Sequence, residues 1–196
     1  MTKAERTKQF ILEQAAPIYN EKGISGTSVD DVLEATKLTK GSIYSHFENK
    51  EDLSIQVSGY LLDKVCSGIS QAMKKETSAK GKIFAYMDFN KTPSDTYIKG
   101  GCPIFNIAVE SDDNHALVNA KVNEIMCVSQ KNFASILRAG IDNGEFSSAL
   151  DPEVYAFKMF AAIEGGTVMC KSMNTDLPMR GLIKSLKSEL ESYEIR

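Results

Sequence analysis

The residues that could do chemistry gather in one short stretch of the N-terminal quarter of the chain. If Leu38, Ile43 and Phe47 face inward on a helix, a set of polar side chains remains on its outer side. Hydroxyl, ammonium and imidazole groups are suited to hydrogen bonds with base edges and phosphates, and Gly41 would let the backbone approach a groove wall. So short a helix gains little stability from this surface, which we therefore expect to contact a nucleic acid. The set comprises Thr39, Lys40, Ser42, Tyr44, Ser45 and His46.

Helices on either side are expected to hold this surface in place. A first helix should end at Gly23, because apolar residues at helical spacing stop there and glycine favours a helix end. A short helix follows, capped by Thr27 or Ser28, and a tight break separates it from the polar helix, which Thr39 caps and which should reach residue 47. Asn49 caps a longer helix over about 51–75. This order of elements predicts a helix-turn-helix.

At this point the sequence resembles a known family. The stretch TSVDDVLEATKLTKGSIYSHFENKEDL is similar to the DNA-binding signature of the TetR family of bacterial transcriptional regulators, and the resemblance covers roughly residues 5–60. Further on, GCPIFNIAVE resembles a segment seen in one branch of the family. One position departs from the pattern, because Lys37 stands where the turn often has glycine, which predicts a small cost of left-handed backbone strain.

The resemblance implies a role for each residue of the polar surface. The helix from Thr39 would enter the major groove, with Lys40, Gly41 and Ser42 nearest the base edges. Further contacts would go to the DNA backbone, although Tyr44 could instead pack and His46 could be an ordinary surface residue. The residues expected to touch DNA are Thr27, Ser28, Thr39, Lys40, Gly41, Ser42, Tyr44, Ser45, His46 and Lys50.

The remainder of the chain predicts more helices. The 196 residues suit one or two compact domains, and helical apolar spacing without strand-like alternation predicts an all-α protein. We expect an N-terminal three-helix helix-turn-helix domain at 1–50 and a C-terminal helical ligand-binding and dimerisation domain at 51–196, joined by the helix 51–75.

A helix beginning at Asp151 is apolar on more than one side. Such a helix needs two partners, and small residues on it would let a second copy approach closely. We expect it, with a helix over about 117–143, to form half of a four-helix dimer interface, as the resemblance also implies. A two-fold dimer predicts a near-palindromic operator. The interface candidates are Phe157, Ala161, Ala162, Gly165, Gly166 and Met169.

Aromatic and methionine side chains recur between the predicted helix-turn-helix and the helix that begins at Asp151. They can be core alone, or they can line an apolar pocket for a small apolar or aromatic inducer that controls DNA binding. Glu110 could orient a polar group of that ligand, or cap or pair locally. Cys102 follows two glycines at a helix start, so it could be a sensor of electrophiles or oxidants, or a small buried residue. The candidate ligand-binding residues are Phe84, Met87, Cys102, Phe105, Glu110, Met126 and Phe133.

The amino-acid composition limits the classes of protein to which this chain can belong. The chain has 23 Lys and Arg against 26 Asp and Glu, a net charge of −3, and 42% hydrophobic residues, which excludes a disordered chain and a generally basic nucleic-acid coat. We expect no membrane span, secretory signal, metal or cofactor, and the four scattered cysteines predict reduced thiols in the cytoplasm. No motif indicates an enzyme. The sequence therefore predicts a ligand-responsive regulator, more often a repressor in this family, with a helical ligand carrier or adaptor that does not bind DNA as the alternative.

Overall fold

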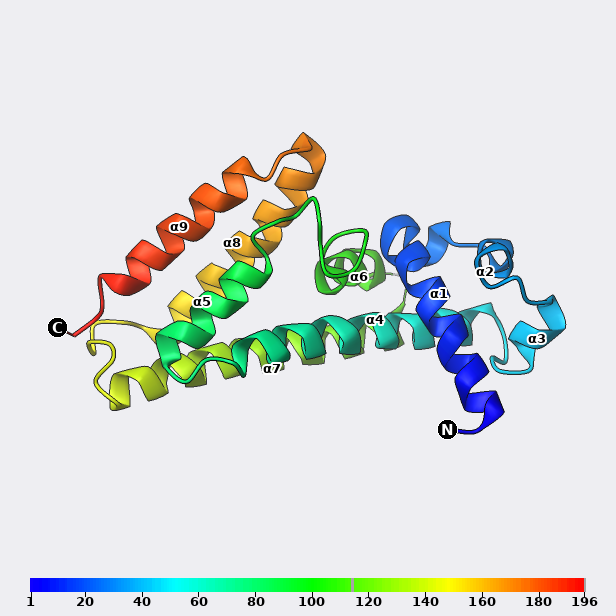
Figure 1. Cartoon of the computed structure of the whole chain (residues 1–196), viewed down its shortest axis with the longest axis horizontal. Coiled ribbons are helices and arrows are strands. Elements are labelled where there is room, and N and C mark those ends of the chain that lie inside the picture. Colours follow the sequence, from blue (N-terminus) through cyan, green and yellow to red (C-terminus); the bar gives the residue numbers. More distant parts are fainter. Residues whose placement is uncertain (114, 196) are drawn as a thin grey trace. The chain divides into compact units, whose positions relative to one another are not determined.

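The computed structural model describes residues 1–113 and 115–195, and within them the chain is helical (Figure 1). Its only strand-like pairing in these residues is a single antiparallel bridge between Phe146 and Glu194. The all-α class is therefore confirmed. The helices are α1 (Lys3–Gly26), α2 (Val29–Thr36), α3 (Lys40–Tyr44), α4 (Lys50–Met73), α5 (Ala79–Phe89), α6 (Pro103–Ser111), α7 (Ala116–Asp142), α8 (Pro152–Met173) and α9 (Leu177–Glu191).

The helices form two compact units, each made from two stretches of the sequence. One unit comprises residues 1–65 and 98–123, and the other comprises 66–97 and 124–196. The sequence had suggested a division at residue 50, whereas here α6 and the start of α7 join the N-terminal helices. The long helices α4 and α7 each contribute to both units. We call the first the head unit and the second the C-terminal unit.

The head unit is built on α1 and the first part of α4. Thr2 begins α1 with a capping box, in which its hydroxyl accepts from the backbone N–H of Glu5. The helix is interrupted at Gly23, where the sequence predicted a helix end. Gly23 has a φ of 80°, which residues with a side chain rarely adopt. Ile11 and Leu53 are fully buried and anchor the core of this unit. The helices α1, α2 and α3 gather around the start of α4 (Figure 1).

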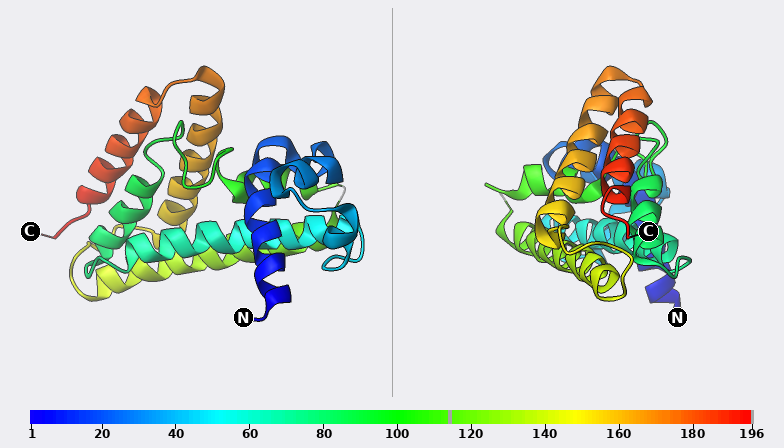
Figure 2. Two further views of the ribbon diagram at one scale, coloured as in Figure 1. Left: turned by 45° about the vertical axis from the view of Figure 1, so that its right-hand side comes forward. Right: turned by 90° about the vertical axis from the view of Figure 1, so that its left-hand side faces the viewer.

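The C-terminal unit contains the antiparallel pair α8 and α9, which lie side by side in both views of Figure 2. The hydroxyl of Tyr155 on α8 donates to the carbonyl of Leu186 on α9 at 2.6 Å, and Lys158 pairs with Glu189 across the same two helices. Burial of the Tyr155 phenol raises its pKa well above the usual value. The pair presents one face of α8 to α9 and leaves another without a partner in the described residues.

Candidate nucleic-acid interface and effector sites

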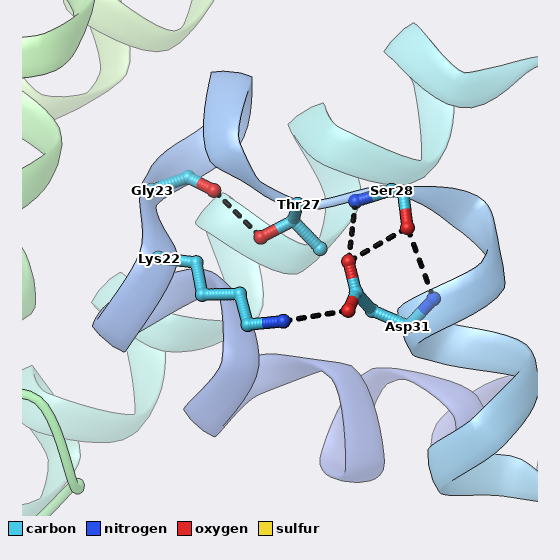
Figure 3. Close-up of polar contacts among 5 residues, drawn as sticks. All are labelled: Lys22, Gly23, Thr27, Ser28 and Asp31. Atoms are coloured by element: carbon cyan, nitrogen blue, oxygen red, sulfur yellow. Dashed lines mark hydrogen bonds and ion pairs between the residues drawn. The ribbon is translucent and has the colours of Figure 1, made fainter.

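The start of α2 is fixed by a network of hydrogen bonds and an ion pair (Figure 3). Ser28 caps the helix, because its Oγ accepts from the backbone N–H of Asp31 at 3.1 Å. The Asp31 carboxylate in turn accepts from the N–H and the hydroxyl of Ser28, at 2.8 and 2.7 Å, and pairs with Lys22 at 2.6 Å. The Lys22 ammonium and the Ser28 groups hold the Asp31 pKa far below its usual range. These contacts fasten α2 to the end of α1.

Thr27 lies inside the head rather than on its surface. Its side chain is 0% exposed, and its hydroxyl donates to the carbonyl of Gly23 at 2.6 Å. Of the two residues expected at this helix start, Thr27 therefore has no side-chain group open to DNA, since its hydroxyl is buried and already paired. Ser28, its neighbour, is exposed and is the residue that caps α2.

The turn between α2 and α3 has the left-handed backbone that the sequence predicted. Lys37 has φ 57° and ψ 25°, and its N–H donates to the carbonyl of Leu33 at 2.8 Å. A non-glycine residue pays a modest strain energy in this region, about 1 kcal/mol or more. The Lys37 side chain is exposed, so the strained position also carries a cation beside α3.

The polar helix α3 presents most of the predicted surface to solvent. Thr39 caps it by accepting from the N–H of Ser42 at 3.2 Å, while Ile43 and Phe47 are buried as expected. The exposed members of the predicted set are Thr39, Lys40, Gly41, Tyr44 and Ser45, and Ser42 and His46 are half-buried. No atom lies within 4 Å of the place where a Cβ on Gly41 would stand, so this part of the backbone is open to close approach.

Helix α3 is shorter than the sequence predicted. It ends at Tyr44, and residues 45–47 form a turn that bonds back to α3, where the N–H of His46 donates to Ile43 at 3.0 Å. The polar side chains after Tyr44 are therefore placed by this turn, since Ser45 also donates its hydroxyl to the carbonyl of Ser42 at 2.7 Å.

Lys50 begins α4 and is exposed. The preceding Asn49 accepts from the N–H of Asp52 at 2.9 Å, which confirms it as the cap of this helix. Exposed ammonium groups on Lys37, Lys40 and Lys50 thus follow one another along the turn, α3 and the start of α4. A short polar helix in a helix-turn-helix, with cations on both sides, is the arrangement of a DNA-reading head.

The comparisons with known proteins agree with this class. Residues 11–57 match the family described as bacterial regulatory proteins, tetR family, and residues 81–186 match the tetracyclin repressor-like C-terminal domain. The chain therefore belongs to the TetR family. As a member it is a ligand-responsive, DNA-binding transcriptional regulator that binds operator DNA as a dimer.

Similar proteins match this chain over most or all of its length. A TetR-family regulator from Cytophaga hutchinsonii is 32% identical, with a TM-score of 0.90 over 100% of this chain and 98% of that one. A TetR regulator from Chloroflexus aurantiacus J-10-fl is 28% identical, with a TM-score of 0.93 over 99% and 98% of the two chains. The transcriptional repressor DhaR of Mycobacterium sp. (strain GP1) is 26% identical over 84% of this chain and 82% of its own length.

The predicted effector residues divide between the two units. Phe84, Met87, Met126 and Phe133 belong to the C-terminal unit, whereas Cys102, Phe105 and Glu110 belong to the head unit. In the C-terminal unit Met87 and Phe133 are buried, and the ring of Phe133 lies 4.5 Å from that of Tyr86 between centroids. Met126 and Phe84 are half-buried. Two ammonium groups approach the Phe84 ring, those of Lys187 at 4.7 Å and Lys80 at 5.9 Å.

Glu110 is occupied by the backbone of α1. Its carboxylate accepts from the N–H groups of Ile24 and Ser25, each at 2.7 Å. The sequence had left open whether Glu110 meets a ligand or caps locally. The structure favours local capping, because both carboxylate oxygens of Glu110 are bonded to the backbone next to Gly23. The carboxylate lies so close to Gly23 that a Cβ at this position would come within 3.0 Å of it.

A second contact between α6 and α1, from Asn20 and Asn106, was missing from the sequence-based interpretation. The buried Asn20 amide donates to the carbonyls of Lys99 and Gly101, at 2.8 and 3.0 Å. Asn106 on α6 donates to Asn20 Oδ1 at 3.0 Å and to the carbonyl of Gly100 at 3.1 Å. No local pattern reveals this network, because its members are about eighty residues apart. Cys102 is half-buried at the position before α6, and its side chain does not cap the helix.

The predicted interface helix α8 exposes large apolar side chains. Phe157 is 66% exposed and Met169 is 61% exposed, and Ala161 between them is exposed as well. A Cβ on Gly165 would meet no atom within 4 Å, so that position is open, and Ala162 is half-buried. These residues remain available to a second copy.

Gly166 on α8 lies close to α9 of the same chain. A Cβ there would come within 3.0 Å of Met179 and of Leu182 on α9. The glycine therefore allows α9 of the same chain to pack closely against α8, and its place in the dimer interface stays a prediction.

Neither a metal-binding cluster nor a membrane-spanning helix occurs in the described residues. No group of His, Cys, Asp and Glu side chains there is arranged to hold a metal ion. Among the same residues, no helix is long and apolar enough to cross a membrane.

Proposed function

We propose that this regulator is a repressor that reads a near-palindromic operator through α3 and is released by a small inducer bound in the C-terminal unit. The observation that carries the proposal is the open polar surface of α3, where Lys40 and Gly41 lie at its N-terminal end. Lys40, Gly41 and Ser42 face the base edges, since the first residues of a recognition helix enter the groove most deeply.

Backbone contacts position the head on the duplex. Tyr44, His46 and Lys50 touch phosphates on one side of α3, and Ser28 at the start of α2 touches the other strand's backbone. The network around Asp31 supports this role, because it holds the start of α2 rigidly against α1.

The second copy covers the exposed face of α8. Phe157, Ala161, Gly165 and Met169 form this face, and burying two large apolar side chains per copy supplies about 1.5–3 kcal/mol for each. The relative DhaR is named a repressor, which supports repression here.

The inducer lies among the aromatic and methionine side chains of the C-terminal unit. Gln130 on α7 supports this placement, because both polar atoms of its amide are buried without a hydrogen-bond partner in the described residues. A buried amide left unpaired costs about 1–3 kcal/mol, so an apolar ligand with one donor and one acceptor for Gln130 would recover that energy. The unit's Phe133 and Met87 would then face the apolar part of the ligand.

We place the protein in the cytoplasm, where thiols stay reduced. The four cysteines, at positions 66, 102, 127 and 170, are thiols rather than disulfides in this structure.

A salt series on the protein's own upstream DNA tests the reading head. We expect Tyr44→Ala to weaken binding, and Lys50→Ala to lower the slope of log affinity against log salt by about one. Lys184→Ala is the matched control, because it removes an exposed lysine from α9 and should leave the slope unchanged. If the wild-type protein selects no sequence from a random DNA pool, the proposal is wrong and the ligand-carrier interpretation replaces it.

A further inference from the structure

The head unit contains a cleft that the proposed function does not use. Its volume is about 570 Å³, which is large enough for a small organic molecule. Three helix ends meet around it: the end of α1, the start of α4 and the start of α7. None of the predicted effector residues lines it. The lining residues are Ile24, Ser25, Lys50, Glu51, Ser54, Ile55, His115, Ala116, Leu117 and Val118.

One residue that lines this cleft, His115, carries a polar atom without a partner. The Nε2 atom of His115 is buried and makes no hydrogen bond in the described residues. The backbone of His115 is held firmly, since its N–H donates to the carbonyl of Ser111 at 3.2 Å and its carbonyl accepts from Asn119 at 2.8 Å. A buried ring nitrogen without a partner costs free energy, which a ligand in the cleft would recover.

The charges around the cleft favour an anion with a single charge. Lys50 brings an ammonium group, and α4 and α7 both begin at the cleft, where the positive end of each helix dipole favours negative charge. Glu51 also lines the wall and would repel a second negative charge. A protonated Nε2 on His115 would donate to the same anion.

The rest of the wall is apolar. Ile24, Ile55 and Val118 offer aliphatic surface, and Leu117, which is 71% exposed, stands at the rim. An apolar body of moderate length would bury this surface, while its charged end meets His115 and Lys50.

We infer that this cleft is a second small-molecule site, which binds a monocarboxylate with an apolar body. Its carboxylate accepts from His115 Nε2 and from the first amides of α7, and its chain covers Ile55 and Val118. Because Lys50 lines the cleft and is also the proposed phosphate contact, occupancy competes with DNA at this lysine. That consequence rests on the proposed function, whereas binding itself does not.

Octanoate serves as the probe, and the readout is the imidazole NMR signal of His115 in the full-length protein without DNA. The chain has two histidines, so the spectrum is simple, and His115→Gln assigns the signals. We expect the His115 signal to move saturably with octanoate while the His46 signal stays in place. Octanol, which lacks the charge, should bind at least about tenfold more weakly, as expected for the loss of one charge-assisted hydrogen bond.

Two filling variants locate the bound probe. Ile55→Trp should abolish the response of His115, and Leu117→Trp, at the exposed rim, does the same with less risk to folding. Circular dichroism confirms that each variant is helical. No saturable movement of the His115 signal in the wild type, or a movement that persists in folded filling variants, overturns the inference.

A DNA-binding arm separates this inference from the proposed function. With both correct, octanoate weakens operator binding by the wild type but not by folded Leu117→Trp. If the NMR response is present and no operator is bound, the proposed function fails and the site stands. If DNA is bound normally and the NMR response is absent, the site fails and the regulator stands.

Discussion

Glu110 should control how firmly α6 is joined to the end of α1. Its carboxylate accepts from the backbone N–H groups of Ile24 and Ser25, each at 2.7 Å. A hydrogen bond to a charged group contributes about 1.5–3 kcal/mol when it is buried. Ser25 is exposed, so water replaces much of its share, whereas Ile24 is buried. We therefore expect Glu110→Ala to cost about 2 kcal/mol of local stability.

Hydrogen exchange of the two amides measures this loss directly. A cost of about 2 kcal/mol corresponds to about thirtyfold in an equilibrium constant, so the Ile24 and Ser25 amides should exchange faster by about that factor. Glu110→Gln keeps one acceptor oxygen of similar shape and should cost about half as much. Val109→Ala is the matched control, because its exposed side chain neighbours Glu110 on α6 and should leave both amides unchanged.

Unchanged exchange of both amides in Glu110→Ala would refute the reasoning, because the carboxylate would then contribute nothing that water does not replace. Faster exchange throughout α1 in both Glu110→Ala and Val109→Ala would also refute it, since the effect would belong to α6 as a whole.

Three other outcomes follow from single contacts. Phe157→Arg on the exposed face of α8 should shift the protein from dimer to monomer in analytical ultracentrifugation, and a dimer of unchanged strength would place the interface elsewhere. Tyr155→Phe removes the bond to the Leu186 carbonyl and should lower the free energy of unfolding by about 1 kcal/mol in urea titrations; no change would mean that water or another donor replaces it. Because Lys22 lowers the folded-state pKa of Asp31, its carboxylate stabilises the head at neutral pH, and this contribution is lost as the pH falls below the unfolded value of about 3.9. The Asp31 carboxyl group should therefore still be ionised at a pH where exposed aspartates titrate. The NMR chemical shift of its carboxyl carbon reports this titration, and a midpoint at the pH usual for aspartate would contradict the network.

Local signals in the sequence predicted the reading head well. Ser28, Thr39 and Asn49 each cap a helix at a start where a short polar side chain was expected, and the left-handed turn falls at Lys37. Helix α6 begins at Pro103, directly after Cys102, where the sequence predicted a helix start. Each of these features depends on residues within four positions of one another, so a single sequence contains the information.

The end of α3 was harder to predict for the opposite reason. Apolar residues at 43 and 47 have helical spacing, which favoured a helix through Phe47. In the structure Phe47 is buried from a turn, and the ammonium of Lys8 on α1 lies 5.3 Å from the centre of its ring. The Phe47 side chain can therefore be buried against α1 without α3 continuing as far as residue 47.

The sequence by itself determined the class of fold, the helix-turn-helix and the polar surface of α3, because helical spacing, capping and turn residues are short-range properties. Tertiary structure alone decided that Thr27 is buried, that Gly166 admits α9, that Glu110 binds the end of α1, and that His115 lines a cleft. The contacts of Gly166, Glu110 and His115 join different helices, and all four features depend on which surfaces meet. Periodicity shows that a residue faces a neighbour, but only packing decides which neighbour it meets.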